Sequence, residues 1–136
     1  PDETHGINDR VQLAAAEREL RRRINIDWME RGVTLVDPDR IHLDATVELE
    51  RDVTLYPGTM LQGACRVGAG ADIGPDCHLT DTVVGESARV LQTSADRATI
   101  GAGAVVGPWA ALGPGDDVAA GAVTGPHYAG PGTSSP

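Results

Sequence analysis

The side chains best suited to chemistry in this 136-residue chain are its histidines and cysteines. Histidine can act as a general base near neutral pH, and both residue types bind zinc. Cys65 and Cys77 are twelve residues apart, and neither has another metal-ligand type at close spacing. The histidines are equally dispersed: His5, His42, His78 and His127. The sequence therefore contains no compact metal or catalytic motif, and the fold must decide which of these residues meet.

A repeat of six residues predicts that fold. Large aliphatic residues occupy every sixth position in two runs: Leu43, Leu49, Leu55, Leu61, Val67, Ile73 and Leu79, then Ile100, Val106, Leu112 and Val118. Small or β-branched residues lie four positions later, with Asp116 as the exception: Val47, Val53, Thr59, Cys65, Ala71, Cys77 and Val83, then Ala104, Ala110, Asp116 and Ala122. A helix repeats every 3.6 residues and a strand every two, so a period of six indicates a short strand followed by a turn.

Repeats of this length are typical of a parallel β-helix, in which three hexapeptides close one coil of about eighteen residues. A β-sandwich, the alternative, would have turns every eight to twelve residues. Both repeated positions point inward, so we expect Cys65 and Cys77 to be reduced core residues on different walls. His42 and His78 each precede a large inward aliphatic and should point outward. They lie two full coils apart on one wall, too far to share an ion within one chain.

We expect the β-helix to span residues 33–124 and to contain about five coils, each advancing by roughly 4.8 Å. The repeat is interrupted after Gly85, where Val90 is out of register and residues 92–96 resemble a loop or a looser wall. Residues 125–136 are rich in Gly, Pro and Ser, and we predict that this tail is mobile or irregular. The open ends of so short a stack imply a partner or a continuing β-helix.

A long helix should precede the coils. Residues 1–7 have no sign of a domain of their own and read as a leader, and residues 8–32 form a helical arm. Asn8 is a suitable N-cap, and Gly32 follows the last turn. One face of this helix carries the apolar residues Leu13, Ala16, Leu20, Ile24 and Trp28. Its other faces mix arginines with acids, which indicates a solvated arm more than a basic binding patch.

The charge of the chain excludes several classes of function. The formal net charge is −9, and all eleven basic residues are arginines. Between residues 41 and 124, four arginines face eleven acids, a local balance of −7. Such a surface repels phosphate backbones, so we expect no nucleic-acid binding. There is neither a run of eighteen apolar residues nor a signal-peptide pattern. We therefore expect no membrane association and a cytoplasmic location.

The order of these elements resembles a known bacterial family. Gly-Ile-Asn-Asp-Arg-Val-Gln-Leu-Ala at 6–14, a long helix, Gly-Val-Thr-Leu-Val-Asp-Pro at 32–38 and hexapeptides such as Val-Thr-Leu-Tyr-Pro-Gly-Thr at 53–59 carry the likeness. It is to the bifunctional N-acetylglucosamine-1-phosphate uridyltransferases and glucosamine-1-phosphate N-acetyltransferases. The likeness covers nearly all of residues 2–123. It implies a left-handed β-helix that forms a homotrimer, uridylyl transfer with magnesium, and acetylation from acetyl-coenzyme A.

The resemblance also implies roles for single residues. Asn8 matches an asparagine that helps to hold the catalytic magnesium together with a distant aspartate, and that aspartate has no counterpart here. Gly113 stands where the family has an arginine that binds the substrate phosphate. His127 is the only candidate for the catalytic histidine, but it lies in the tail, out of register. We therefore expect no complete catalytic or cofactor site in this chain alone, and Asn8 as its one candidate metal ligand.

Two classes of function remain open at this stage. The first is a fragment of the bifunctional enzyme that acts as a structural arm and a trimerising β-helix, with a catalytic domain or further coils supplied elsewhere. The second is a stand-alone hexapeptide-repeat acyltransferase, or a zinc enzyme of the carbonic anhydrase type. The zinc enzyme would need three histidines that converge at subunit interfaces.

Overall fold

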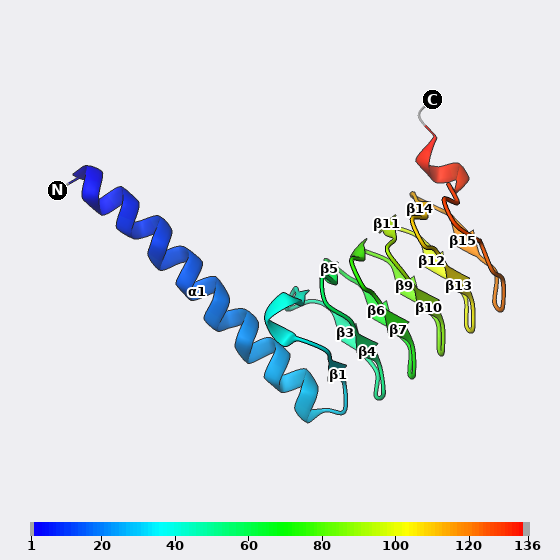
Figure 1. The fold of residues 1–136 in the computed structure, drawn as a ribbon, viewed down its shortest axis with the longest axis horizontal. Coiled ribbons are helices and arrows are strands. Elements are labelled where there is room, and N and C mark those ends of the chain that lie inside the picture. Colours follow the sequence, from blue (N-terminus) through cyan, green and yellow to red (C-terminus); the bar gives the residue numbers. More distant parts are fainter. Residues whose placement is uncertain (1, 135–136) are drawn as a thin grey trace.

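One long helix leads into a stack of coils (Figure 1). The computed structural model describes the backbone of residues 2–134 and the side chains of residues 9–134. Helix α1 covers Asp2–Glu30 and points away from the coils, and only its last turns lie beside them. Within the described chain, no helix is long and apolar enough to cross a membrane. The molecule is therefore mainly β, with a single helical arm.

The coils are built from three parallel sheets of five short strands each. The first sheet contains β1 (Thr34–Leu35), β4 (Thr54–Leu55), β7 (Asp72–Ile73), β10 (Arg89–Val90) and β13 (Val105–Val106). The second contains β2 (His42–Leu43), β5 (Met60–Gln62), β8 (His78–Thr80), β11 (Ser94–Asp96) and β14 (Ala111–Leu112). The third contains β3 (Glu48–Leu49), β6 (Arg66–Val67), β9 (Val83–Val84), β12 (Thr99–Ile100) and β15 (Asp117–Val118). The expectation of about five coils is confirmed.

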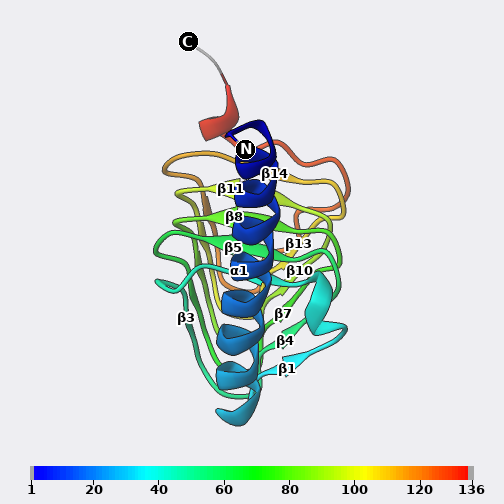
Figure 2. The same ribbon diagram turned by 90° about the vertical axis from the view of Figure 1, so that its left-hand side faces the viewer.

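The winding of the coils is left-handed. Seen from the helix end, the chain passes from β1 on the right, across the top through β2, to β3 on the left as it recedes, which is counter-clockwise (Figure 2). Parallel strands joined by a crossover almost always wind the other way, so this coil is an exception to that rule. The short 3-10 helix η1 (Pro38–Arg40) lies between β1 and β2.

The core of the prism consists of the repeated apolar positions. Leu55, Leu61, Ile73 and Leu79 are fully buried, as are the smaller Val53 and Ala71. Leu43 pairs with Leu61, and Leu61 with Leu79, so identical positions of successive coils lie directly above one another. Each buried Leu or Ile side chain contributes about 1.5–3 kcal/mol relative to exposure. These aliphatic columns confirm the predicted β-helix.

The register changes in the middle of the stack. Leu79 pairs with Ala95 and Val84 with Ile100, sixteen residues apart, against eighteen for Leu43 and Leu61. The shorter spacing corrects the prediction for Val83. This residue is 42% exposed, because the buried Thr82 takes the small inward position and Val84 becomes the large one. Of the two interpretations of residues 92–96, a loop or a looser wall, the structure shows a wall, since Ser94–Asp96 form β11, whose buried Ala95 continues the Leu79 column.

Helix α1 begins earlier than predicted. Its range, Asp2–Glu30, includes most of the expected leader and places Asn8 inside the helix, so the prediction of Asn8 as N-cap is wrong. A polar sequence without a strong breaker can continue a helix, and Gly6 does not interrupt it. The predicted apolar face of the helix packs against the coils only near its C-terminal end. Leu13 and Leu20 are mostly exposed, whereas Ile24 and Trp28 pack against the core.

The tail is ordered as far as Ser134. Val123 bridges to β13 and Ala129 bridges to β14, so residues 123–129 begin a further, irregular coil. A 3-10 helix, η2 (Pro131–Thr133), follows and lies against β14. Of the two predicted outcomes, mobile or irregular, the structure shows an irregular tail. It lacks the aliphatic repeat and is held by backbone hydrogen bonds to the coil beneath it.

Candidate functional site

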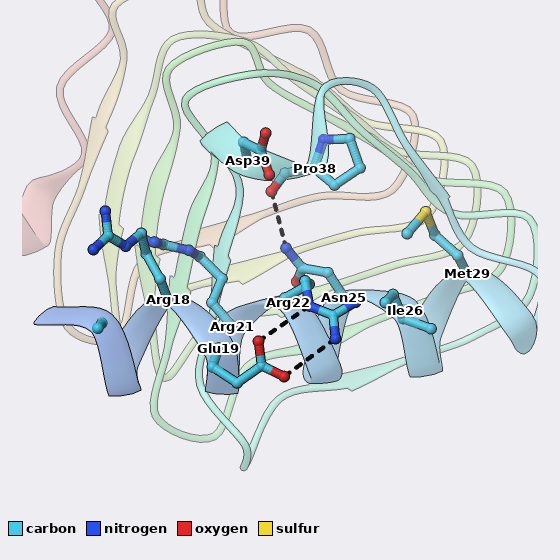
Figure 3. Close-up of a pocket in the computed structure, with 10 residues that line it drawn as sticks. Arg18, Glu19, Arg21, Arg22, Asn25, Ile26, Met29, Pro38 and Asp39 are labelled. Carbon is cyan, nitrogen blue, oxygen red and sulfur yellow. Dashed lines mark hydrogen bonds and ion pairs between the residues drawn. The ribbon is translucent and has the colours of Figure 1, made fainter. Parts of the chain in front are cut away.

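A hollow lies between α1 and η1 (Figure 3). Its volume is about 550 Å³, and its cationic side chains are Arg18, Arg21 and Arg22. The remaining lining residues are Ala15, Glu19, Asn25, Ile26, Met29, Pro38 and Asp39. One end of the groove is therefore charged, and the other, at Ile26, Met29 and Pro38, is apolar.

Part of that charge is already neutralised within α1. Glu19 accepts hydrogen bonds from Arg22 Nε and Nη2, both at 3.2 Å, and from Arg23 Nε at 3.1 Å. These hydrogen bonds, Arg22 first and Arg23 next, hold the pKa of Glu19 below its ordinary value. The pairs are exposed to solvent and contribute little to stability. Arg22 therefore belongs to a helix-surface network with Glu19 and Arg23.

Asn25 fixes the helix to the first coil. Its Nδ2 donates to the carbonyl oxygens of Pro38 and Ile41 at 3.0 and 3.1 Å, and the residue is 2% exposed. Its Oδ1 is buried without a hydrogen-bond partner. These two hydrogen bonds from the side-chain amide hold η1 against α1 and so set the width of the groove. Sequence reasoning missed Asn25; an amide among the apolar positions near Ile24 and Trp28 was the available signal.

A second contact joins the helix to the coils nearby. Arg21 Nη1 lies 3.0 Å from His42 Nδ1 and 3.3 Å from Nε2. Burial lowers the pKa of His42, and the Arg21 guanidinium lowers it further. Arginine has no acceptor, so the imidazole must be neutral at the nitrogen that receives this hydrogen bond. His42 points outward as predicted, and its neighbour is a helix residue that the β-strand pattern does not identify.

The other histidines are placed apart from His42. His78 lies on the same sheet two strands on, as predicted, and its Nε2 is 2.6 Å from Gln62 Oε1. His127 stacks on Trp109, with ring centroids 5.4 Å apart and an interplanar angle of 17°. Both rings are exposed at a corner of the prism. The fold thus brings none of these three imidazoles together, and the side chain of His5 lies outside the described ones.

The cysteines occupy the core positions that the repeat predicts. Both are unpaired and buried, Cys65 between β5 and β6 and Cys77 between β7 and β8. Burial raises the pKa of both thiols, that of Cys77 to about 11. Such protonated thiols are poor nucleophiles and poor metal ligands. The interpretation of Cys65 and Cys77 as reduced core residues is confirmed.

Asn8 remains a prediction as a metal ligand, because its side chain lies outside the described ones. Among the described residues, no group of three His, Cys, Asp or Glu side chains is arranged to hold a metal ion. At the opposite end of the chain, Gly113 lies beneath η2. A Cβ at Gly113 would overlap the carbonyl of Gly132. A side chain at position 113, where the resemblance implies a phosphate-binding arginine, would therefore collide with the tail in this fold.

Comparison with known proteins decides the relationship. The bifunctional protein GlmU of Rhodococcus jostii is 53% identical over 110 residues, or 81% of this chain and 22% of its own length. That of Micrococcus luteus is 52% identical over 83% of this chain and 23% of its own length. That of Alkalilimnicola ehrlichii is 47% identical over 92% of this chain and 27% of its own length. The chain is homologous to a segment of GlmU.

The chain spans about a quarter of the length of these GlmU relatives. The resemblance to the bifunctional uridyltransferase and acetyltransferase family is thereby confirmed. No protein-family model matches the chain. Among solved structures, the acetyltransferase domain of PglB from Neisseria gonorrhoeae, in complex with acetyl coenzyme A, matches with a TM-score of 0.50 at 15% identity. The match covers 80% of this chain and 63% of that one, and supports the β-helix fold alone.

Proposed function

We propose that this chain serves as the arm and the base of the β-helix in a bifunctional GlmU-type enzyme. That enzyme would acetylate glucosamine-1-phosphate and transfer uridylyl to the product. The observation that carries the proposal is the alignment with GlmU, which includes both the helix and the coils and covers 81–92% of this chain. The contribution of these residues would be structural, with turnover dependent on parts of the longer relatives.

The arrangement of polar groups supports a structural role. Arg22 is engaged by Glu19 and Arg21 by His42, and His78 is engaged by Gln62. The position where the family has a phosphate-binding arginine is Gly113, closed off by Gly132. Magnesium and acetyl-coenzyme A would then be bound with residues from elsewhere in such an enzyme. Asn8 would contribute an amide oxygen to the magnesium, a ligand type that suits this hard cation.

We also propose that the chain forms a homotrimer through the walls of its prism. A groove of about 810 Å³ lies along the outer face of the third sheet, between the end of α1 and strands β3, β6 and β9. Its lining includes the half-buried Trp28, the exposed Val83 and the ion pair of Arg66 with Glu48 at 3.1 Å. Apolar surface within a charged rim is typical of protein interfaces. The cytoplasm is the location that we propose for this assembly.

The direct test is an acetyl-transfer assay. The purified chain is incubated with glucosamine-1-phosphate and acetyl-coenzyme A, and released thiol is measured beside a full-length GlmU as positive control. We expect no transfer above background, and turnover by the chain alone would contradict a purely structural role. Metal analysis distinguishes the anhydrase-type alternative, which requires one zinc per subunit. Light scattering should give the mass of three chains, and a monomer would contradict the trimer.

A further inference from the structure

Arg21 contacts His42 one turn before Asn25 on α1. Closer to the C-terminal end of the helix lie Asn25, with its two hydrogen bonds, and the apolar residues Ile24 and Trp28, which pack against the core. Helix α1 touches β1, β2 and η1, and the turns before Arg21 carry the exposed Val11 and Leu13. Arg21 and His42 therefore stand where the docked part of the helix ends.

Each of these two residues shares a small groove with a carboxylate of its own element. The small groove around them, about 200 Å³, is lined by Glu17 and Arg21 from α1 and by His42 and Asp44 from the first coil, with Leu20, Ile24 and Leu43 as its apolar part. Glu17 precedes Arg21 by four residues, the spacing at which a helix places opposite charges side by side. Asp44 follows His42 by two residues along the chain, and its Oδ2 already accepts a hydrogen bond from Gly63 N at 2.8 Å, so Oδ1 is the oxygen that would receive the imidazolium. The neighbour of His42 on β5 is the uncharged Met60.

We propose that the Arg21–His42 contact is a pH-sensitive clamp on the helical arm. When His42 takes up a proton it can no longer accept a hydrogen bond from Arg21, and two cations then face each other about 3 Å apart. Arg21 turns to Glu17 and the imidazolium turns to Asp44. This exchange of partners removes the hydrogen bond between helix and coil and replaces it with one ion pair inside each element.

The direction of the effect follows from the proton balance. Burial first and Arg21 second lower the pKa of His42 in the folded chain, so the unfolded chain binds this proton at a higher pH. The contribution of the clamp is therefore fully present above the ordinary histidine value of about 6.5 and is lost as the pH falls through the lowered pKa of the folded state.

The test uses the whole chain with Trp109→Phe, which leaves Trp28 as the only tryptophan. Trp28 packs against the core near the docked end of the helix, so its emission reports how the arm is seated. We expect a reversible red shift between pH 8 and pH 4.5, and a ring titration of His42 with the same midpoint by NMR. Far-ultraviolet circular dichroism should show that the coils stay folded throughout.

Three variants separate the clamp from other titrations. His42→Gln should abolish the transition. His78→Gln is the matched control and should leave the transition intact, because His78 lies two strands away on the same sheet and is hydrogen-bonded to Gln62. Arg21→Gln keeps a neutral donor and removes the repelling charge, so the midpoint should move up toward the ordinary histidine value. A transition unchanged in His42→Gln would overturn the proposal, and so would a flat profile in the parent chain.

Discussion

Gly113 and Gly132 are in van der Waals contact across the C-terminal end of the β-helix, with no room for a side chain between them. The carbonyl of Gly132 lies where a Cβ of Gly113 would be, and Thr133 N lies close beside it. A residue other than glycine at 113 therefore excludes the seated form of η2. In this fold the tail occupies the space that a longer side chain at 113 would need.

We predict that Gly113→Arg releases the tail and does not create a phosphate site. The backbone at Gly113 has an ordinary negative φ, so the cost arises from the collision with Gly132. Amide hydrogen exchange in residues 130–134 should become fast. The free energy of unfolding, measured by urea denaturation, should fall by about 1–3 kcal/mol, because the tail's hydrogen bonds to the coil are no longer made. Gly115→Ala is the matched control. Its φ is +81° with open space around it, so backbone strain of about 1–2 kcal/mol is expected without release of the tail.

Asp116 should be the main anchor of the tail. Its carboxylate is 8% exposed and accepts hydrogen bonds from Gly113 N at 2.7 Å and Gly132 N at 2.6 Å. Asp116→Asn keeps the shape but replaces one acceptor with a donor that faces an N–H group, and we expect a loss of about 1–3 kcal/mol in urea denaturation. Asp117→Asn, an exposed neighbour on β15, should change stability by less than about 0.5 kcal/mol. Equal effects at the two positions would contradict this assignment.

The shift of register around β9 can be tested with two adjacent valines. Val84 is 2% exposed and Val83 is 42% exposed. Val84→Ala removes buried methyl groups and should cost about 2 kcal/mol of unfolding free energy, whereas Val83→Ala should cost less than about 0.5 kcal/mol. Thermal and urea denaturation of the two variants measure the difference. The unbroken six-residue repeat would give the opposite order, with Val83 the more costly position.

Cys77 should be almost inert toward alkylating reagents in the folded chain. Its pKa is raised to about 11 by burial, so its thiolate fraction at pH 8 is about a hundredfold smaller than that of a thiol with a pKa of 9. Mass spectrometry after iodoacetamide treatment should find Cys77 unmodified until urea unfolds the chain. The raised pKa also means that stability falls as the pH rises from about 9 toward 11, because the unfolded chain releases this proton first. Rapid labelling at pH 8 without denaturant would contradict both statements.

The sequence by itself determined the β-helix, its five coils, the buried cysteines and the outward histidines. These features depend on a local rule. Three six-residue repeats make one coil, so each repeated position stacks on its equivalent in the next coil, and the period alone places Leu61 above Leu43. The rule failed at Val83 because a coil can lose a residue at a corner and still keep its walls, and the period does not show which corner changed.

Only the tertiary structure decided the contacts between elements of different kinds. The meeting of Arg21 with His42, the seating of Asn25 on η1 and the anchoring of Gly132 by Asp116 each join residues more than a dozen positions apart. No repeat relates these partners, because a helix and a coil have different periods and the tail has none. Their pairing depends on the angle at which α1 leaves the first coil and on the path of the chain after β15, which are properties of the packed molecule.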